Sequence, residues 1–306
     1  SSKLVIKGGK PLGGKTEIRG SKNAATKMMV ASLLTKDPCV IENIPLSDDI
    51  DITAELCQKI GSELSWSGRT CKMQTETIAA SQVPELSRRN RIPVLALGPL
   101  LHRKGVAEVP VLGGCPIGHR PINFHLEALN RMGVKLERRD KCYYAEAERI
   151  NGAEIELPYP SVGATENIIL TAVLAEGDTE IRNAAIEPEI TNLIDMLITM
   201  GGKISCDYGS RKIKISGVRR LSGTSVRVMP DRNEIVSFAV LALATSGDII
   251  MQNTDKFFDF FSAGRVNFLE IFLQKIREMG GNFENTKDGL RFWGQAPYRA
   301  VSIETA

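Results

Sequence analysis

The chain has 306 residues, of which 42% are hydrophobic and 25% charged, and its formal net charge is +3. This length favours about two domains, and the composition is ordinary for a soluble globular protein. The small charge gives no support for a nucleic-acid partner, and no apolar run approaches a membrane-spanning helix or a secretory leader. We therefore expect a cytoplasmic protein that binds neither nucleic acid nor membrane.

The first predicted helix begins near Ser21, in Gly20-Ser-Lys-Asn23, and runs through an apolar stretch at 28–34. A helix that is apolar on most sides is expected to be buried. A strand-like segment follows at 39–43, and the next helix, amphipathic this time, ends at Gly61. Glycine is favoured there because a helix often ends in a left-handed residue.

The same order of elements recurs along the chain with a period of about 70 residues. The first helices of the repeats are predicted to begin near Ser21, Arg91, Val162 and Asp231, and the second helices to end at Gly61, Gly133, Gly201 and Gly280. Further strand-like segments at 180–183 and 249–253 end in Asn, as 39–43 does. The sequence predicts an α/β fold of about four repeats, each with two helices and several strands, which must pack together to bury their helices.

Basic residues stand at three of the predicted first-helix starts, namely Lys22, Arg91 and Arg232. A helix N-terminus offers free N–H groups and a partial positive charge, so it attracts anions. These positions are candidate sites for phosphate or carboxylate. Ordinary helix caps with solvated neighbours are the alternative for each of them.

Six cysteines are scattered along the chain without a C-x-x-C pair or a histidine cluster, which favours reduced thiols over disulfides or a zinc site. Cys115 differs from the others because it lies in a glycine-rich segment at 111–121, close to His119 and Arg120. A cationic setting lowers the pKa of a thiol, so Cys115 is the candidate reactive cysteine. A simple connecting loop is the alternative.

Five motifs carry a resemblance to a known family. They are Ser21-Lys-Asn-Ala-Ala25, the Gly-Gly-Cys-x-Ile-Gly-x-Arg-Pro run ending at Pro121, Ser161-Val-Gly-Ala-Thr165, Asn183-Ala-Ala-x-Glu-Pro-Glu189 and Pro230-Asp-Arg232. Together they resemble the UDP-N-acetylglucosamine 1-carboxyvinyltransferases, a family of enolpyruvyl transferases, and the resemblance runs from Lys3 to Ala306. It implies an inside-out α/β barrel of βαβαββ repeats.

The resemblance also implies an activity. The family transfers the enolpyruvyl group of phosphoenolpyruvate to the 3-hydroxyl of UDP-N-acetylglucosamine, the first committed step of peptidoglycan synthesis, and needs no metal or organic cofactor. Cys115 would be the general acid toward the methylene carbon and the thiol that fosfomycin alkylates. Lys22 and Arg120 would join it in catalysis. The implied substrate-binding residues are Lys22, Asn23, Arg91, Arg120, Pro121, Ile122, Asn123, Phe124, His125, Ser161, Val162, Gly163, Glu187, Glu189 and Arg232.

The sequence departs from the family pattern in two ways. The family has six repeats in two domains of three, whereas four are found here. We expect residues 21–229 to form a three-repeat domain with the cysteine loop, and 1–20 with 230–306 to form an incomplete second domain. The family's general-base aspartate would follow Ala306, so we expect little turnover from these residues alone. Locally, Asn123 replaces a usual Asp, and Tyr159-Pro160 replaces a Lys-containing segment.

Three alternatives remain at this stage. A shikimate-pathway enolpyruvyl transferase shares the repeats and the lysine-bearing first helix but needs no Gly-Gly-Cys loop. An RNA-end cyclase of related repeats needs a catalytic histidine, and His102, His119 and His125 lack that context. A non-catalytic homologue would bind the sugar nucleotide without turning it over. The oligomeric state is not predicted.

Overall fold

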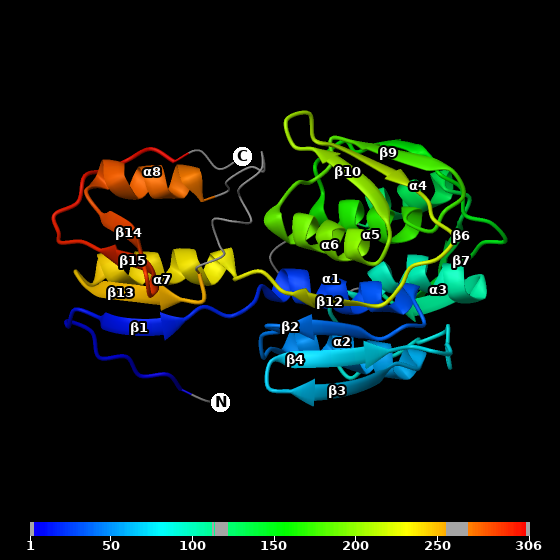
Figure 1. The fold of residues 1–306 in the computed structure, drawn as a ribbon, viewed down its shortest axis with the longest axis horizontal. Helices are drawn as coiled ribbons and strands as arrows, with labels where there is room; N and C mark the ends of the chain where they lie inside the picture. Colours follow the sequence, from blue (N-terminus) through cyan, green and yellow to red (C-terminus); the bar gives the residue numbers. More distant parts are fainter. Residues whose placement is uncertain (1–2, 112, 114–121, 255–268, 304–306) are drawn as a thin grey trace. The chain divides into compact units, whose positions relative to one another are not determined.

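A computed structural model describes residues 3–111, 113, 122–254 and 269–303 of the chain. The chain divides into two compact units (Figure 1). The larger unit is Gly20–Met229, and the smaller unit combines Ser1–Arg19 with Pro230–Ala306.

The larger unit contains three repeats of helices and strands. The first has α1 (Lys22–Ala31), η1 (Ser32–Leu34), β2 (Cys39–Glu42), α2 (Asp48–Ile60), β3 (Glu63–Ser67) and β4 (Thr70–Gln74). The second has η2 (Pro93–Ala96), α3 (Leu97–Lys104), β5 (Val106–Pro110), α4 (Asn123–Arg131), β6 (Lys135–Arg138) and β7 (Cys142–Glu146). The third has β8 (Glu154–Glu156), α5 (Val162–Ala172), β9 (Asp178–Arg182), α6 (Pro188–Thr199), β10 (Lys203–Asp207) and β11 (Lys212–Ser216), and β12 (Thr224–Arg227) ends the unit.

The smaller unit contains one repeat, built from both ends of the chain. Its elements are β1 (Gly13–Glu17), α7 (Arg232–Ala244), β13 (Asp248–Gln252), α8 (Glu270–Met279), β14 (Asn282–Thr286) and β15 (Gly289–Trp293). The predicted α/β repeat architecture is therefore confirmed.

Each repeat has its own sheet, and three of the four sheets follow one plan. The strand orders are β12-β2-β4-β3, β10-β11-β9-β8 and β1-β13-β15-β14, each with one parallel edge strand beside three antiparallel strands. The second repeat has the shorter order β5-β7-β6, and a single parallel bridge between Gln82 and Glu108 stands at the corresponding edge. These described sheets are open and separate, and in the larger unit α1, α5 and α6 lie between two of them (Figure 1).

Two edge strands are exchanged between distant parts of the sequence. β1 precedes α1 in the chain but pairs with β13, and β12 precedes α7 but pairs with β2. The first and last described repeats are each completed by a strand from the other end of the repeat series.

The predicted helix ends are confirmed by backbone geometry. Gly61, Gly133, Gly201 and Gly280 all have positive φ, between 90° and 119°. Three asparagines behave alike where the strands after the first helices end: Asn43, Asn183 and Asn253 have φ of 62°, 52° and 62°. Asparagine tolerates this left-handed region better than most residues. Their side-chain amides donate to the carbonyls of Val228, Leu157 and Ile18, each directly after a parallel edge strand.

The first helices of repeats one and three are buried as expected. Residues 24–31 of α1 and 164–172 of α5 are buried. In contrast, α7 leaves Val240 and Leu241 exposed by 49% and 37%. The other side of α7 contributes Ile235 and Ala239 to a core with Phe292 of β15.

The first helix of repeat two does not begin at Arg91. A 3₁₀ turn starts at Pro93 and the α-helix only at Leu97. Proline is favoured in the first helical turn because its missing N–H has no intrahelical acceptor there, which explains why helical structure begins after Arg91.

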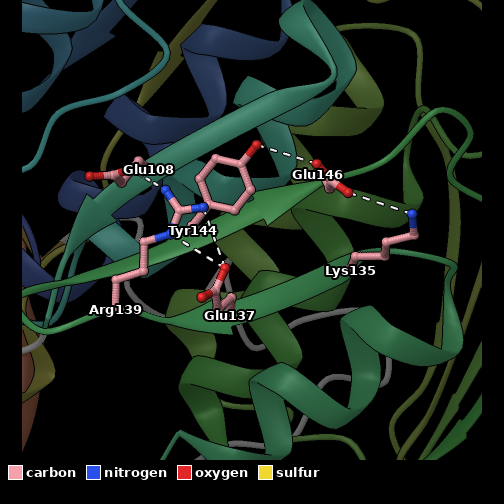
Figure 2. A network of polar contacts seen from close by, with 6 residues as sticks. All are labelled: Glu108, Lys135, Glu137, Arg139, Tyr144 and Glu146. Atoms are coloured by element: carbon pink, nitrogen blue, oxygen red, sulfur yellow. Dashed lines mark hydrogen bonds and ion pairs between the residues drawn. The ribbon is translucent and has the colours of Figure 1, made fainter.

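The solvent face of the second sheet carries a polar network (Figure 2). The guanidinium of Arg139 lies 3.7 Å from the ring centroid of Tyr144 and pairs with Glu108 and Glu137 at 3.4 and 3.3 Å. Glu146 accepts from the Tyr144 hydroxyl. These contacts link all three strands on the face opposite the buried Ala107 and Ala145.

Within the described residues no helix combines the length and hydropathy that crossing a bilayer requires.

Candidate active site

The start of α1 is held close to the end of β2. A Cβ added to Gly20 would lie 1.8 Å from the carbonyl oxygen of Asn43, so only glycine fits. The next residue, Ser21, is fully buried; its backbone N–H donates to Met229, while its Oγ has no hydrogen-bond partner. This packing fixes where Lys22, the first residue of α1, leaves the backbone.

Lys22 forms an ion pair with the start of α2. Its Nζ lies 2.7 Å from Oδ2 of Asp49, and the two side chains are 42% and 34% exposed. Burial acts to raise the pKa of Asp49, but hydrogen bonds and charge from Lys22, together with a hydrogen bond from Asn90, lower it overall. Asp49 is therefore an anion that holds Lys22 in place. Asn23 is half-buried in the same first turn of α1.

Asn90 extends this network toward the cysteine segment. Its Nδ2 donates to Asp49 at 3.3 Å, its Oδ1 accepts from Ile92 N, and its carbonyl accepts from Gly113 N at 3.2 Å. Arg91 is the next residue and is half-buried. Cys115, Arg120 and Pro121 lie outside the described residues. The hydrogen bond to Gly113 links the network to a residue two positions before Cys115.

The starts of α4 and α5 meet at His125. This side chain is 5% exposed, its Nδ1 is 3.2 Å from Nδ2 of Asn167, and a Cβ on Gly163 would lie 3.2 Å from its ring. Burial and the positive charge of Arg91 lower the pKa of His125 to about 4. A neutral imidazole at physiological pH follows, so His125 serves as a packing and hydrogen-bonding group.

The residues beside His125 differ in accessibility. Ile122 is buried and precedes α4, Asn123 is exposed at its first position, and Phe124 is half-buried. At α5, Ser161 caps the helix by accepting from Ala164 N, and Val162 and Gly163 are half-buried in the first turn. The capped start of α5 thus lies beside that of α4.

The start of α6 carries two carboxylates that face a third. Glu187 precedes the helix, and Glu189 is 2% exposed in its first turn. Glu166 of α5 is 1% exposed, and burial together with the charges of Glu189 and Glu187 raises its pKa to about 7, although Lys27 opposes the shift. Lys27 Nζ lies 3.8 Å from Oε1 of Glu166.

Arg232 belongs to the smaller unit. It is the first residue of α7, capped by Asp231, whose side chain accepts from Asn233 N at 2.8 Å. Arg19 N donates to Glu234 in the same turn. Two hydrogen bonds therefore fix the first turn of α7, to which Arg232 belongs.

The predicted residues fall into distinct groups within the larger unit. One group joins Lys22 to Asp49 and Asn90, a second surrounds His125, and a third contains Glu187 and Glu189. Asp49, Asn90, Lys27, Glu166 and Asn167 were missed by the sequence-based prediction. The available signal was a lone lysine and a lone glutamate inside otherwise apolar helices, since such charges are rarely buried without a partner. No described group of three or more His, Cys, Asp or Glu side chains could hold a metal ion.

Comparison with known proteins assigns the sequence to a family. The family model for EPSP synthase (3-phosphoshikimate 1-carboxyvinyltransferase) matches residues 6–306. A UDP-N-acetylglucosamine 1-carboxyvinyltransferase of Protochlamydia amoebophila is 41% identical over 99% of this chain, which spans 65% of that relative's length. UDP-N-acetylglucosamine 1-carboxyvinyltransferase 1 of Carboxydothermus hydrogenoformans is 38% identical over 99% of the chain, which spans 70% of its length.

Solved structures share the fold. The enolpyruvyl transferase NikO of Streptomyces tendae superposes with a TM-score of 0.81 at 19% identity, covering 96% of this chain and 68% of that one. An EPSP synthase of Acinetobacter baumannii gives 0.63 at 15% identity, covering 96% and 84%. With the sequence relatives and the repeated βαβαββ units, these findings show that the chain belongs to the UDP-N-acetylglucosamine 1-carboxyvinyltransferases, within the EPSP synthase family of enolpyruvyl transferases.

Proposed function

We propose that the protein containing this chain transfers the enolpyruvyl group of phosphoenolpyruvate to the 3-hydroxyl of UDP-N-acetylglucosamine. The observation that carries the proposal is the identity of 38–41% over 99% of the chain to relatives named for this reaction. The structure supports it with Lys22 at a helix N-terminus, where an anionic substrate is favoured, tied through Asp49 and Asn90 to the start of the cysteine segment.

In this proposal the chain's cations bind and orient the substrates. Lys22 and Arg120 hold the phosphate and carboxylate of phosphoenolpyruvate, because fixed cations stabilise negative charge without rearranging during the reaction. Asn23, Arg91 and the starts of α4 and α5 hold the sugar nucleotide. The exposed Asn123 at the start of α4 can donate and accept hydrogen bonds, as recognition of a uracil ring requires.

Cys115 is the proposed acid. Its thiol proton passes to the methylene carbon of phosphoenolpyruvate while the sugar 3-hydroxyl oxygen adds to the neighbouring carbon. That hydroxyl loses its proton to a base. The carbon–oxygen bond to phosphate then breaks, and loss of a proton from the new methyl group restores the double bond. A positioned acid is needed because protonation of an enol ether carbon builds positive charge beside the phosphate ester.

The proposal also covers where the protein acts and what inhibits it. Its described cysteines are free thiols, which suits the reducing cytoplasm. Cys115 is the thiol that fosfomycin is expected to alkylate. The product of the transfer reaction would enter peptidoglycan synthesis, and it would thereby support cell-wall growth, cell shape and cell division.

Phosphate release by the complete protein that contains these 306 residues tests the proposal. Release is expected only when phosphoenolpyruvate and UDP-N-acetylglucosamine are both present, and Lys22→Met should lower it by about 100-fold or more, the cost of losing a preorganised charge. Lys104→Met, at an exposed position in the last turn of α3, is the matched control. Release with shikimate 3-phosphate instead, or sugar-nucleotide binding without release, would contradict the proposal.

A further inference from the structure

Lys27 is a buried cation on the helix that carries Lys22. It lies five residues further along α1, and its side chain is only 11% exposed. Removing an ammonium group from water is costly unless an anion lies nearby. The carboxylate of Glu166, 1% exposed, is 3.8 Å away, so α1 and α5 are joined by a buried charge pair.

This pair is not a saturated hydrogen-bonded bridge. A separation of 3.8 Å exceeds hydrogen-bond length, and Glu166 Oε1 is buried without a hydrogen-bond partner. Glu187 Oε2, at the start of α6, is buried and unpartnered as well. Buried polar atoms are normally satisfied, so these two carboxylate oxygens are exceptions that call for a structural or functional reason.

Charged residues at α6 and on α2 interact electrostatically with the Lys27–Glu166 pair. Glu187 and Glu189 act on Glu166 from α6, and Lys27 acts on Glu166 from α1. Lys27 also lowers the pKa of Asp49, the partner of Lys22 on α2. The ring of His125 on α4 forms a hydrogen bond with Asn167, the residue after Glu166. His102 on α3 forms a hydrogen bond with the carbonyl of Thr171. Both histidines have pKa values lowered by burial, so neither supplies the balancing charge at neutral pH.

We propose that Lys27 and Glu166 are positioning residues for the transfer reaction: their ion pair places the Glu187 and Glu189 carboxylates on one side and the Asp49–Lys22 pair on the other. The inference rests on the proposed function for its link to catalysis. Ionised Glu166 attracts Lys27 and holds α1 against α5. Protonated Glu166 leaves Lys27 without its anion and changes the field at Glu187 and Glu189.

A pKa of about 7 for Glu166 makes this pair titrate near neutral pH. The ionised form dominates above this pH, so substrate turnover should fall as pH drops through about 7. Removing the charge of Lys27 stabilises protonated Glu166, so the loss of turnover should then begin at a higher pH. Replacing Glu166 with glutamine removes this titration altogether.

The first experiment needs no substrate. Carboxyl carbons of glutamate are ¹³C-labelled in the complete protein, and the resonance missing from Glu166→Gln is followed with pH. The expected midpoint lies near 7 in the unsubstituted protein. It should rise by about 1 on the pH scale in Lys27→Met, since an opposite charge at this range shifts a carboxyl by that much or more. Lys15→Met, which breaks an exposed ion pair with Asp288, is the matched control and should leave it unchanged.

The second experiment follows phosphate release over the same pH range. Lys27→Met should move the acidic limb upward by the same amount, and Glu166→Gln should lower the plateau by about tenfold and abolish that limb. The double variant should match Glu166→Gln. A purely structural role predicts losses that are equal at every pH.

The outcomes separate the two proposals. The inference is overturned if Glu166 of the unsubstituted protein titrates near 4.5, the ordinary value for glutamate. It is also overturned if folded Lys27→Met shows neither a shifted Glu166 titration nor a shifted acidic limb of phosphate release. If Lys27→Met does not fold, the titration of the unsubstituted protein and the pH profile of Glu166→Gln decide it. If the unsubstituted protein releases no phosphate at any pH, the proposed function fails, and the carbon titration still judges whether the pair exists.

Discussion

The side-chain amide of Asn43 donates a 3.0 Å hydrogen bond to the carbonyl of Val228, a residue 185 positions later in the chain. The same contact recurs from Asn183 to Leu157 and from Asn253 to Ile18. In each case the asparagine has positive φ and the carbonyl follows a parallel edge strand. One residue type thus both turns the chain and secures the edge of a sheet.

Asn43→Ala should therefore lose two favourable features. Alanine strains the left-handed backbone and removes the donor to the buried carbonyl, so we expect the free energy of unfolding to fall by about 2–3 kcal/mol. Asn43→Gly keeps the backbone conformation and should lose less. Urea unfolding measures both, with exposed Asn130→Ala as the control. Equal stability of the alanine and glycine variants would show that backbone strain plays no part.

Arg103 connects α3 to two loops of the first repeat. Its guanidinium donates to the carbonyls of Leu33, Thr35, Thr75 and Glu76 at 2.9–3.0 Å. Arg103→Lys keeps the charge, but a lysine cannot donate to all four carbonyls. We therefore expect the free energy of unfolding, measured in guanidinium chloride, to fall by about 2–3 kcal/mol. Lys104→Met, next to it and exposed, should change stability little. A lysine variant as stable as the unsubstituted chain would mean that water satisfies these carbonyls.

Asp49→Asn tests the ion pair with Lys22. The folded pKa of Asp49 lies below its ordinary value of 3.8, so the ionised form adds stability above that value, and this is lost as pH falls through the folded pKa. Because both side chains are partly exposed, the difference between aspartate and asparagine at neutral pH should be only about 0.5–1 kcal/mol. Unfolding curves should converge at the acid end. A constant difference at all pH values would assign the effect to packing.

His125 should make the chain sensitive to mild acid. Its folded pKa of about 4 lies below the ordinary 6.5, so the unfolded state binds the proton first as pH falls. Stability is then lost between these two values, by about 1.5 kcal/mol from pH 6.5 to about pH 5. His125→Gln should lose this pH dependence while keeping a polar side chain beside Asn167. Denaturant unfolding at both pH values provides the test, and an unchanged acid loss in the variant would point to other groups.

Thiol labelling should discriminate strongly among the cysteines. Burial raises the pKa of Cys39 to about 11 and of Cys57 and Cys71 to about 12, so their reactive thiolates are scarce at neutral pH. We expect an epoxide analogue of phosphoenolpyruvate, with sugar nucleotide present, to label Cys115 first in the native protein. Peptide mass spectrometry reads the site. Labelling spread evenly over all six thiols would remove Cys115 from its proposed role.

Local backbone features of the repeats were predictable from the sequence. Gly61 and Gly280 end amphipathic helices at equivalent places, and a left-handed cap needs no information from elsewhere in the chain. Long-range polar contacts were not predictable in this way. Asn90 and Asp49 are 41 residues apart, and nothing in either local pattern specifies the other. Lys27 and Glu166 were predictable in part. Each is a charged residue inside an apolar helix, which indicates a buried ion pair, but the local sequence does not predict which residue is its partner.

The exchange of edge strands affects how the chain is made. Gly13 pairs with Asp248, so β1 leaves the ribosome long before β13 is synthesised. The whole larger unit is translated between them, and its first sheet in turn waits for β12 near residue 224. Distant pairings of this kind slow folding and leave a strand edge unprotected meanwhile. β1 is therefore synthesised before the larger unit but pairs only after that unit has been translated, so its edges need protection on the nascent chain in the meantime.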